Sequence, residues 1–342
     1  MYEEKPVIKN SEIFTDDFIP TQLNHRDGQI KSIRDDLKPI LNKQPGRHVF
    51  IYGPPGTGKT CTSLHITKEL ESETVSATYI NCWETHSRFK VLYNILETLG
   101  MKLSIRTKGI ATHELLDILK TRLKEKHCVV ILDEVDQLED DKILYDLITT
   151  SNLTLILISN TETVLADTDP RIRSRLASAD NLEFSRYTNS EITEILKERA
   201  SLGLVPHVVK PSQLESIADA SAGDSRIAIN ILRIAAEDAD KADTGKITDE
   251  HINKALPTAE KESKKKTIET MNDHQKIIYA VVNTTSKIQP SDLYTKYKKE
   301  CKKQEIEPVK DRTIRKYIEK MVQYKLLLAE GDNKWRTYSA SE

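Results

Sequence analysis

Hydrophobic and polar positions show two periodicities along this chain of 342 residues. Between residues 48 and 184, short runs of β-branched and other apolar residues alternate with longer stretches whose apolar residues recur every three or four positions. The short runs predict strands at 48–52, 77–80, 128–132, 153–159 and 182–184, and the longer stretches predict helices at 59–70, 88–99 and 113–125. Since the strands are apolar almost throughout, we expect an α/β domain whose parallel sheet is covered by helices on both faces.

From residue 188 to 256 only the helical spacing of apolar residues remains, which predicts a small helical domain attached to the sheet. The spacings Thr188-x-x-Glu191 and Ser212-x-x-Glu215 predict capping boxes at two helix starts. Residues 258–272 contain the sequence KESKKK without apolar periodicity and are interpreted as a linker, with a fraying helix start as the alternative.

The last part of the chain has the outline of a winged helix. Helical patterns at 275–283, 291–303 and 311–324 precede two short apolar runs at 326–329 and 335–338, which flank the turn sequence EGDN at 330–333. We therefore predict four segments: an α/β domain at 1–187, a helical lid at 188–257, a linker at 258–272 and a winged helix at 273–342.

The composition excludes several classes of protein. The chain is 38% hydrophobic and 30% charged, which is typical of folded domains and not of disordered or fibrous proteins. No apolar stretch approaches the roughly 20 residues that a membrane span needs, and the N-terminus has no signal-peptide pattern. The four cysteines are far apart with no CxxC, which argues against a zinc site or a disulfide framework. We expect a soluble cytoplasmic protein without a membrane partner.

The charge is unevenly distributed. Residues 258–342 carry 19 Lys and Arg against 13 Asp and Glu, whereas the other residues carry 32 against 40. A basic C-terminal segment on an acidic body indicates a polyanionic partner for that segment, although a lysine-rich solvated surface is the alternative.

A phosphate-binding loop follows the first predicted strand and precedes a predicted helix. The sequence GPPGTGKT at 53–60 fits the pattern G-x-x-x-x-G-K-[ST] without a mismatch. In such a loop the backbone N–H groups surround the phosphates of ATP or ADP, the lysine reaches the β- and γ-phosphates and the hydroxyl binds Mg²⁺. The residues expected to bind nucleotide here are Gly53, Pro54, Pro55, Gly56, Thr57, Gly58, Lys59 and Thr60, with Cys61 directly after them.

Acidic and polar residues follow two other predicted strands. Asp133 and Glu134 come directly after the strand 128–132, so they lie at the carboxyl edge of the sheet beside the phosphate loop. Asp133 is expected to hold Mg²⁺ together with Thr60, and Glu134 to orient or deprotonate the attacking water. Asn160 follows the strand 153–159 and is expected near the γ-phosphate, with a turn-forming role as its alternative.

Arginines form a second set of candidates. Guanidinium groups suit phosphoryl oxygens, and PRIRSR at 170–175 offers Arg171, Arg173 and Arg175. Arg226 opens a helix of the lid and is a further candidate to reach the nucleotide. For each of them an ordinary solvated arginine is the alternative.

Basic residues also decorate the third helix of the predicted winged helix. Ile314, Ile318 and Met321 are expected to face inward, whereas the basic side chains fall largely on the other side, where they are able to enter a major groove. The residues expected to bind DNA are Arg312, Arg315, Lys316 and Lys320 in this helix, and Lys334 and Arg336 in the wing.

Together these features resemble the AAA+ ATPases, and most closely the archaeal replication initiators related to the origin recognition complex and the cell-division-cycle helicase loader. The motifs that carry this resemblance are YGPPGTGKT (52–60), ILDEVDQL (131–138), ISN (158–160), PRIRSRL (170–176), YTNSEITEILKERA (187–200) and GDSRIAINILR (223–233), with the C-terminal winged helix. The chain is somewhat shorter than is usual in this family, and its wing is compact.

The resemblance implies roles that the spacing alone does not give. Asn160 matches a polar sensor of the γ-phosphate, and Arg226 matches the sensor arginine of the lid. Further matches are Tyr187 and Arg199 at nucleotide-contacting lid positions, His25 and Arg26 in a segment that packs against adenine, Arg175 as the first choice of arginine finger with Arg173 as the second, and Arg106 and Lys108 in an inserted segment that touches DNA.

The function that the resemblance implies is an ATP-dependent replication initiator. Such a protein binds duplex origin DNA, alone or with a paralogue or further copies of itself, helps to recruit the replicative helicase, and uses weak ATP hydrolysis as a switch. A clamp-loader-like remodelling ATPase and an ATP-responsive transcriptional regulator are the alternatives. If the protein is a replication initiator, we expect it to be associated with the nucleoid.

Overall fold

The computed structural model describes all residues except 1–5, 72–74, 102–109, 325, 332–335 and 342. The chain divides into two compact units, Met1–Glu260 and Lys261–Glu342. Each unit has its own core and is described by itself.

The first unit is built on a five-stranded parallel sheet. Its strands are β1 (Val49–Tyr52), β2 (Val75–Asn81), β3 (His127–Asp133), β4 (Leu153–Ser159) and β5 (Asp180–Glu183). They lie in the order β2-β3-β4-β1-β5, and every neighbouring pair is parallel. Because β1 lies beside β4 and β3 is the next strand, the segments that follow these three strands meet at one edge of the sheet.

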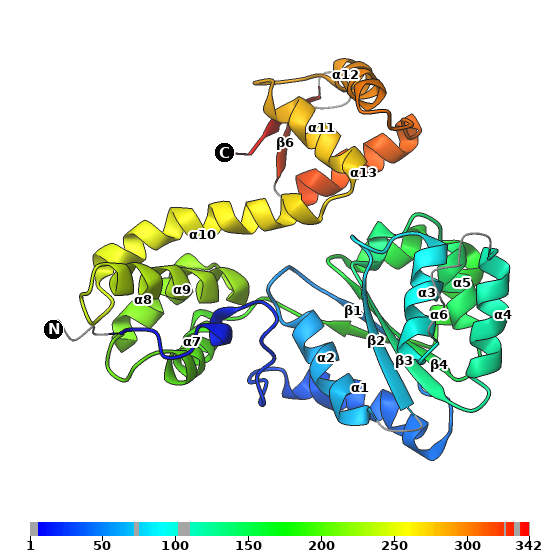
Figure 1. Ribbon diagram of the computed structural model, residues 1–342, viewed down its shortest axis with the longest axis horizontal. Coiled ribbons are helices and arrows are strands. Elements are labelled where there is room, and N and C mark those ends of the chain that lie inside the picture. Colours follow the sequence, from blue (N-terminus) through cyan, green and yellow to red (C-terminus); the bar gives the residue numbers. More distant parts are fainter. Residues whose placement is uncertain (1–5, 72–74, 102–109, 325, 332–335, 342) are drawn as a thin grey trace. The chain divides into compact units, whose positions relative to one another are not determined.

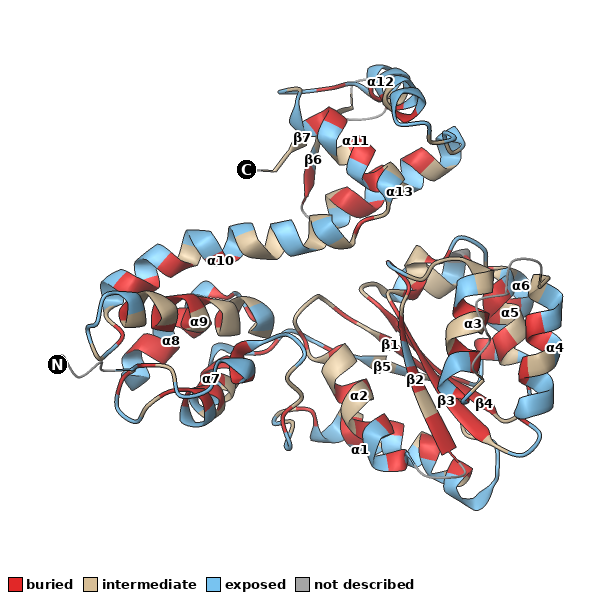
Figure 2. Ribbon diagram, viewed as in Figure 1, coloured by how far each residue is buried: buried red, intermediate tan, exposed pale blue. Residues whose placement is uncertain are grey.

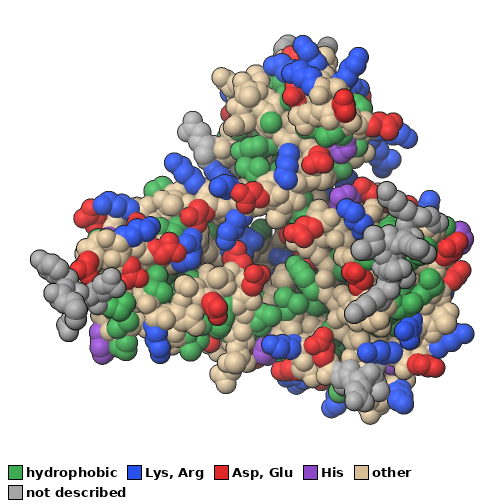
Figure 3. All heavy atoms as spheres, in the orientation of Figure 1, with side chains coloured by type: hydrophobic (Ala, Val, Ile, Leu, Met, Phe, Trp, Pro, Cys, Tyr) green, Lys and Arg blue, Asp and Glu red, His purple; other side chains and the backbone are tan. Residues whose placement is uncertain are grey.

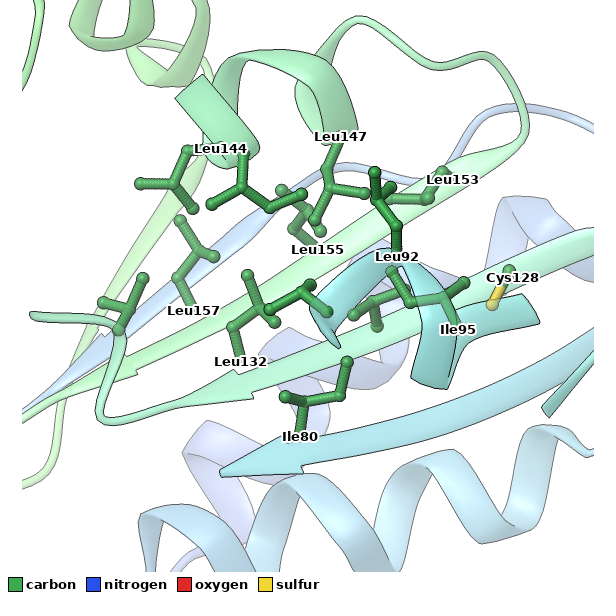
Figure 4. Packing of buried hydrophobic residues seen from close by; sticks show 14 of the residues in the cluster. Ile80, Leu92, Ile95, Cys128, Leu132, Leu144, Leu147, Leu153, Leu155 and Leu157 are labelled. Atoms are coloured by element: carbon green, nitrogen blue, oxygen red, sulfur yellow. The ribbon is translucent and has the colours of Figure 1, made fainter. Parts of the chain in front are cut away.

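Helices cover both faces of this sheet (Figure 1). On one face lie α1 (Asp27–Leu37) and α2 (Lys59–Leu70), and on the other lie α3 (Arg88–Thr98), α4 (Thr112–Arg122), α5 (Lys142–Ile148) and α6 (Pro170–Leu176). Alternate residues of one strand enter different cores: Leu155 and Leu157 of β4 pack with α3 and α5 (Figure 4), whereas Ile156 and Ile158 pack on the side of α1 and α2. The predicted α/β class with a doubly covered sheet is confirmed.

Short 3₁₀ turns complete this part of the fold. They are η1 (Ser11–Phe14), η2 (Lys38–Asn42), η4 (Val135–Gln137) and η5 (Glu162–Asp167). The turn η1 is held against the lid, since the N–H groups of Lys9 and Asn10 donate to the carbonyl of Gly203 at 2.8 and 3.0 Å.

The predicted helical lid consists of α7 (Asn189–Gly203), α8 (Pro211–Ala220) and α9 (Ser225–Lys241). The capping box of Thr188 and Glu191 is confirmed at the start of α7. The one predicted from Ser212 and Glu215 is wrong, because α8 begins earlier, at Pro211, and Gln213 accepts from the N–H of Lys210 instead. Proline is favoured in the first turn of a helix, which explains the earlier start.

Residues 258–270, interpreted above as part of a linker, are helical. They belong to α10, a continuous helix from Asp249 to Thr270 that contains Pro257. The boundary between the compact units falls inside this helix, after Glu260. A lack of apolar periodicity therefore marks the unit boundary without marking a break in the helix.

The second unit has the predicted winged-helix outline. It contains α11 (Asp273–Asn283), α12 (Pro290–Lys303), α13 (Asp311–Gln323) and an antiparallel pair of strands, β6 (Leu327–Glu330) and β7 (Thr337–Ala340). Figure 2 shows buried positions on the inward sides of α11 and α13. Ile314, Ile318 and Met321 are at most 1% exposed, as predicted.

Among the described helices, none combines the length and the apolar character that a membrane span requires. The four cysteines are free thiols: Cys82, Cys128 and Cys301 are buried, and Cys61 is half-buried.

Candidate functional site

The phosphate loop joins β1 to α2 with three glycines in the left-handed region, Gly53, Gly56 and Gly58, at φ angles of 147°, 72° and 86°. Gly58 is the N-cap of α2. A Cβ at Gly53 would lie 2.1 Å from the carbonyl oxygen of Phe184, so no other residue fits there without displacing the backbone. A turn of this kind at a helix start forms a concave row of N–H groups that binds anions.

Lys59 turns its ammonium group back over the loop. Its Nζ donates to the carbonyls of Gly53 and Pro54 at 2.7 and 2.9 Å, and to Oδ1 of Asn160 at 3.0 Å. The side chain is buried, and burial lowers the pKa of Lys59 to about 8. Its three acceptors are neutral, so a charged phosphate oxygen competes well for this ammonium group.

A hydroxyl and a carboxylate lie together at the end of β3. Thr60 Oγ1 donates to Asp133 Oδ2 at 2.5 Å, and the hydroxyl of Tyr79 donates to the same oxygen at 3.1 Å. Asp133 is only 6% exposed, and burial raises its pKa. Hard oxygen donors so close together are the ligands that Mg²⁺ prefers, and the residues present therefore fit such an ion.

Glu134 and Asn160 face each other at the same edge. Asn160 Nδ2 donates to both carboxylate oxygens of Glu134, at 3.0 and 2.9 Å, while its Oδ1 accepts from Lys59. Glu134 has a φ of 54°, an uncommon value for a residue with a side chain. The side-chain amide of Asn160 thus lies between Lys59 and Glu134, and the structure brings these three predicted residues together.

The lid touches the phosphate loop directly. The backbone N–H and the hydroxyl of Ser225 donate to the carbonyl of Gly56 at 3.1 and 2.8 Å. Asp224 caps α9, and its Oδ1 lies 1.8 Å from where a Cβ at Gly56 would be. Arg226 is exposed and pairs with Asp224 at 3.3 Å, and its charge is among those that act on Lys59.

The N-terminal segment lies behind the loop. Arg26 is 4% exposed; its Nε donates to the carbonyl of Thr57 at 3.0 Å and its Nη2 to that of Ser185 at 2.8 Å. Its guanidinium carbon lies 3.9 Å from the ring centroid of Tyr187, which is buried. His25, with a φ of 65°, points to the lid, where its Nε2 lies 2.9 Å from Glu194.

Arg199 and Cys61 are further members of this neighbourhood. Arg199 is 8% exposed and donates to the carbonyls of Ile13 and Phe18 at 2.7 and 3.4 Å. Burial raises the pKa of Cys61 to about 11, an effect that the charge of Arg199 opposes. The contacts of Arg199 therefore join the lid to the N-terminal segment.

The predicted finger arginines lie on α6. Arg175 is exposed, with its guanidinium carbon 5.3 Å from the ring centroid of Tyr145. Arg171 is paired with Asp169 at 2.8 Å, and Arg173 donates to a carbonyl of η5. The structure does not bring Arg175 into the cluster of Lys59, Asn160 and Glu134.

In the second unit, the predicted basic face of α13 is present with one correction. Arg312, Arg315 and Lys316 are exposed, but Lys320 is only 7% exposed. Residues three positions apart are neighbours on a helix surface, and Lys320 follows the half-buried Tyr317 by three positions. Lys320 therefore lies at the side of the buried stripe of α13 and not on the opposite face. Figure 3 shows Lys and Arg side chains gathered at the α12 end of this unit.

The other residues predicted to bind DNA give less geometry. Arg336 is half-buried, with a fully buried Nε. Lys334, and also Arg106 and Lys108, lie outside the described residues.

Three residues of the site were missed by sequence reasoning: Tyr79, Asp224 and Ser225. Tyr79 stands beside Ile131 in the register of β2 and β3, two positions before Asp133. For Asp224 and Ser225, the signal was their place in GDSR at the start of the helix that contains Arg226.

Comparisons with known proteins bear on both units. Three family models match the chain: an AAA domain at residues 42–165, a Cdc6 AAA+ ATPase-type lid domain at 193–256 and a CDC6 C-terminal winged helix domain at 266–341. ORC1-type DNA replication protein 9 of Halobacterium salinarum is 38% identical over 336 residues, which cover 97% of this chain and 94% of that protein. The chain belongs to the ORC1-type DNA replication proteins.

Other ORC1-type proteins match over similar lengths. ORC1-type DNA replication protein 1 of Sulfurisphaera tokodaii is 31% identical over 96% of this chain and 88% of its own length. The ORC1 protein of Aeropyrum pernix, solved in complex with DNA, has a TM-score of 0.79 at 23% identity, covering 99% of this chain and 95% of that one. The resemblance inferred from the motifs is confirmed, and as an AAA+ ATPase of this family the chain binds a nucleotide.

Proposed function

We propose that this protein is an ATP-dependent replication initiator that binds duplex origin DNA and helps to recruit the replicative helicase. The observation that carries the proposal is the match to ORC1-type DNA replication proteins along 97% of the chain. Support comes from the arrangement of Lys59, Glu134 and Asn160 around one amide group and from the exposed basic residues of α13. The cytoplasm, in contact with the nucleoid, is the expected location.

In this proposal the nucleotide is ATP or ADP, bound with Mg²⁺. Lys59 and the N–H groups of the phosphate loop bind the phosphates, and Thr60 and Asp133 hold the metal ion. When bound, the ion would neutralise part of the negative charge of the phosphates. Glu134 takes the proton of the attacking water.

Hydrolysis is proposed to be slow and to act as a switch. Asn160 donates to both carboxylate oxygens of Glu134 and orients this carboxylate, and each oxygen keeps a lone pair that accepts the proton of water. A weak ATPase acts as a timer only if the two nucleotides favour different lid arrangements, because equal affinities shift no equilibrium. We assign that difference to Arg226, with Tyr187 and Arg199 as further nucleotide-contacting lid residues and with His25 at the adenine side.

Arginines on the surface are assigned to partners. Arg175 is exposed on α6, which supports a role toward the nucleotide of a neighbouring copy or paralogue. Arg312, Arg315 and Lys316 are assigned to DNA, together with Lys334 and Arg336 in the wing and with Arg106 and Lys108 of the first unit. We keep the four proposed segments, and residues 258–270 of the linker at 258–272 are helical.

The test is a selection of genomic fragments by the full-length protein with ATP, at a salt concentration near physiological, because phosphate contacts alone retain any duplex at low salt. We expect a few intergenic repeats to be enriched. Arg312→Ala with Lys316→Ala should abolish this enrichment, whereas Lys210→Ala with Lys241→Ala, which removes the same charge from exposed sites of the lid, should not.

Three other outcomes contradict the proposal. Uniform recovery of fragments from the wild type argues against origin recognition and favours the remodelling ATPase. Enrichment confined to promoters of unrelated genes favours the transcriptional regulator. Equal loss of enrichment in both double variants refutes the assignment to α13.

A further inference from the structure

Two residues from outside the phosphate loop hold consecutive carbonyl groups of that loop. Ser225 donates to the carbonyl of Gly56 from its backbone N–H at 3.1 Å and from its hydroxyl at 2.8 Å. Arg26 donates from Nε to the carbonyl of the next residue, Thr57, at 3.0 Å. One donor comes from the lid and the other from the segment before α1.

Holding a carbonyl fixes the N–H group that follows it. In a trans peptide the C=O and the next N–H point in opposite directions. The bond from Ser225 to Gly56 therefore turns the N–H of Thr57 away from the lid residue, and the bond from Arg26 to Thr57 does the same for the N–H of Gly58.

These peptide planes need such support. Gly56 and Gly58 flank Thr57 with φ angles of 72° and 86°, and glycine changes backbone conformation at little steric cost. An anion-binding row of N–H groups works only when successive N–H groups converge on one side. A loop with rotating planes would present carbonyl oxygens to an anion part of the time.

Both donors are themselves held in place. Arg26 is only 4% exposed, and its guanidinium group packs against the ring of Tyr187. Its Nη2 donates to the carbonyl of Ser185 at 2.8 Å. Ser225 is the first residue of α9, directly after Asp224, whose carboxylate caps that helix by accepting from the N–H of Arg226 at 3.0 Å. The orientation of the loop thus depends on two separate elements of the first unit.

We propose that Ser225 and Arg26 are positioning residues that preset the N–H groups of Thr57 and Gly58 for the phosphate chain of a nucleotide. The inference deepens the proposed nucleotide site and rests on it. It assigns Arg26 to the phosphate side of the site, in place of the adenine side implied by the resemblance.

The test compares ADP with adenosine, because only ADP carries phosphates. Binding of each is measured by calorimetry or by ligand-observed NMR on the full-length wild type, on Ser225→Ala and on Arg26→Lys. Ser225→Ala removes one of two donors, so we expect ADP affinity to fall about threefold to tenfold, with roughly tenfold for Arg26→Lys. Adenosine affinity should change less than about twofold in both, since no phosphate is involved.

Matched controls are available in the same unit. Ser216→Ala removes a hydroxyl of α8 that donates to the carbonyl of Ser212, and Arg34→Lys changes an exposed arginine of α1 that pairs with Glu69. Both should leave the affinity for either ligand unchanged. A thermal melt without nucleotide reports whether each variant is folded, and Ser225→Ala keeps the test decisive if Arg26→Lys does not fold.

Two results would overturn the inference while the nucleotide site stands: an unchanged ADP affinity in Ser225→Ala, or equal falls for ADP and adenosine. Equal falls in Arg26→Lys would return Arg26 to the adenine side. A wild type that fails to bind ADP would overturn the nucleotide site as well.

Discussion

Replacing Asn160 by alanine should slow ATP hydrolysis while leaving nucleotide binding nearly intact. The substitution removes the donor to both oxygens of Glu134, at 3.0 and 2.9 Å, and one of the three acceptors of Lys59. Hydrogen bonds to charged groups contribute about 1.5–3 kcal/mol. If that energy holds the carboxylate in its working orientation, kcat should fall roughly 10- to 100-fold.

Nucleotide affinity should change less, because Lys59 keeps the carbonyls of Gly53 and Pro54 as acceptors and stays oriented over the loop. We expect Kd for ADP to rise by no more than about threefold. The assays are steady-state phosphate release and fluorescent ADP titration on the full-length protein. Asn181→Ala is the matched control, since Asn181 lies in β5 and its side-chain amide donates to the nearby carbonyl of Ala179.

A double-mutant cycle decides whether Asn160 acts through Glu134. Glu134→Gln should retain nucleotide and stop hydrolysis, and adding Asn160→Ala to it should slow the residual rate little further, because residues that act as a unit are not additive. Fully additive losses, or an unchanged kcat in Asn160→Ala alone, would refute the reasoning.

Three further outcomes are expected. Tyr79→Phe removes a donor to Asp133 Oδ2, so the Mg²⁺ concentration for half-maximal hydrolysis should rise about threefold to tenfold in a metal titration, and an unchanged value would exclude this contact from metal binding. Burial and the neighbouring Asp180 raise the pKa of Asp36 to about 6. The preference of the folded state for the protonated side chain therefore adds stability below the pKa of Asp36 in the unfolded chain, and this stability is lost as the pH rises through 6. Asp36→Asn should therefore stabilise the first unit at pH 7.5 by about 1–2 kcal/mol after allowance for solvent screening, and by much less at pH 4, in urea unfolding; equal effects at both pH values would contradict this. Lys59→Ala should abolish binding of fluorescent ADP, and retention of wild-type affinity would contradict its assignment.

The residues that sequence predicts best are those whose chemistry depends on local spacing. The phosphate loop needs only a strand before it and a helix after it, and Asp133 and Glu134 need only a buried strand that ends beside the loop. Asn160 follows the same rule. In each case the neighbour in space is fixed by the parallel order of the strands, which the alternation of strands and helices already indicates.

Contacts between distant elements are what the sequence does not disclose. The bond from Tyr79 to Asp133 depends on the register of β2 against β3, and the bond from Ser225 to Gly56 depends on how α9 approaches the loop. The same holds for Arg26, whose neighbours lie 31 and 159 positions away along the chain. Lys320 shows a further limit, because a residue on the flank of a helix is buried or exposed according to what packs there.

The state of the four thiols has a practical consequence for following the lid. Cys82, Cys128 and Cys301 are fully buried, and the thiol of Cys61 has a pKa of about 11, so almost no thiolate is present at neutral pH. Mild oxidants and thiol-directed dyes should react slowly with the native protein. A single cysteine introduced at an exposed lid position would be labelled selectively, so the lid could be compared with and without nucleotide while every natural cysteine is kept.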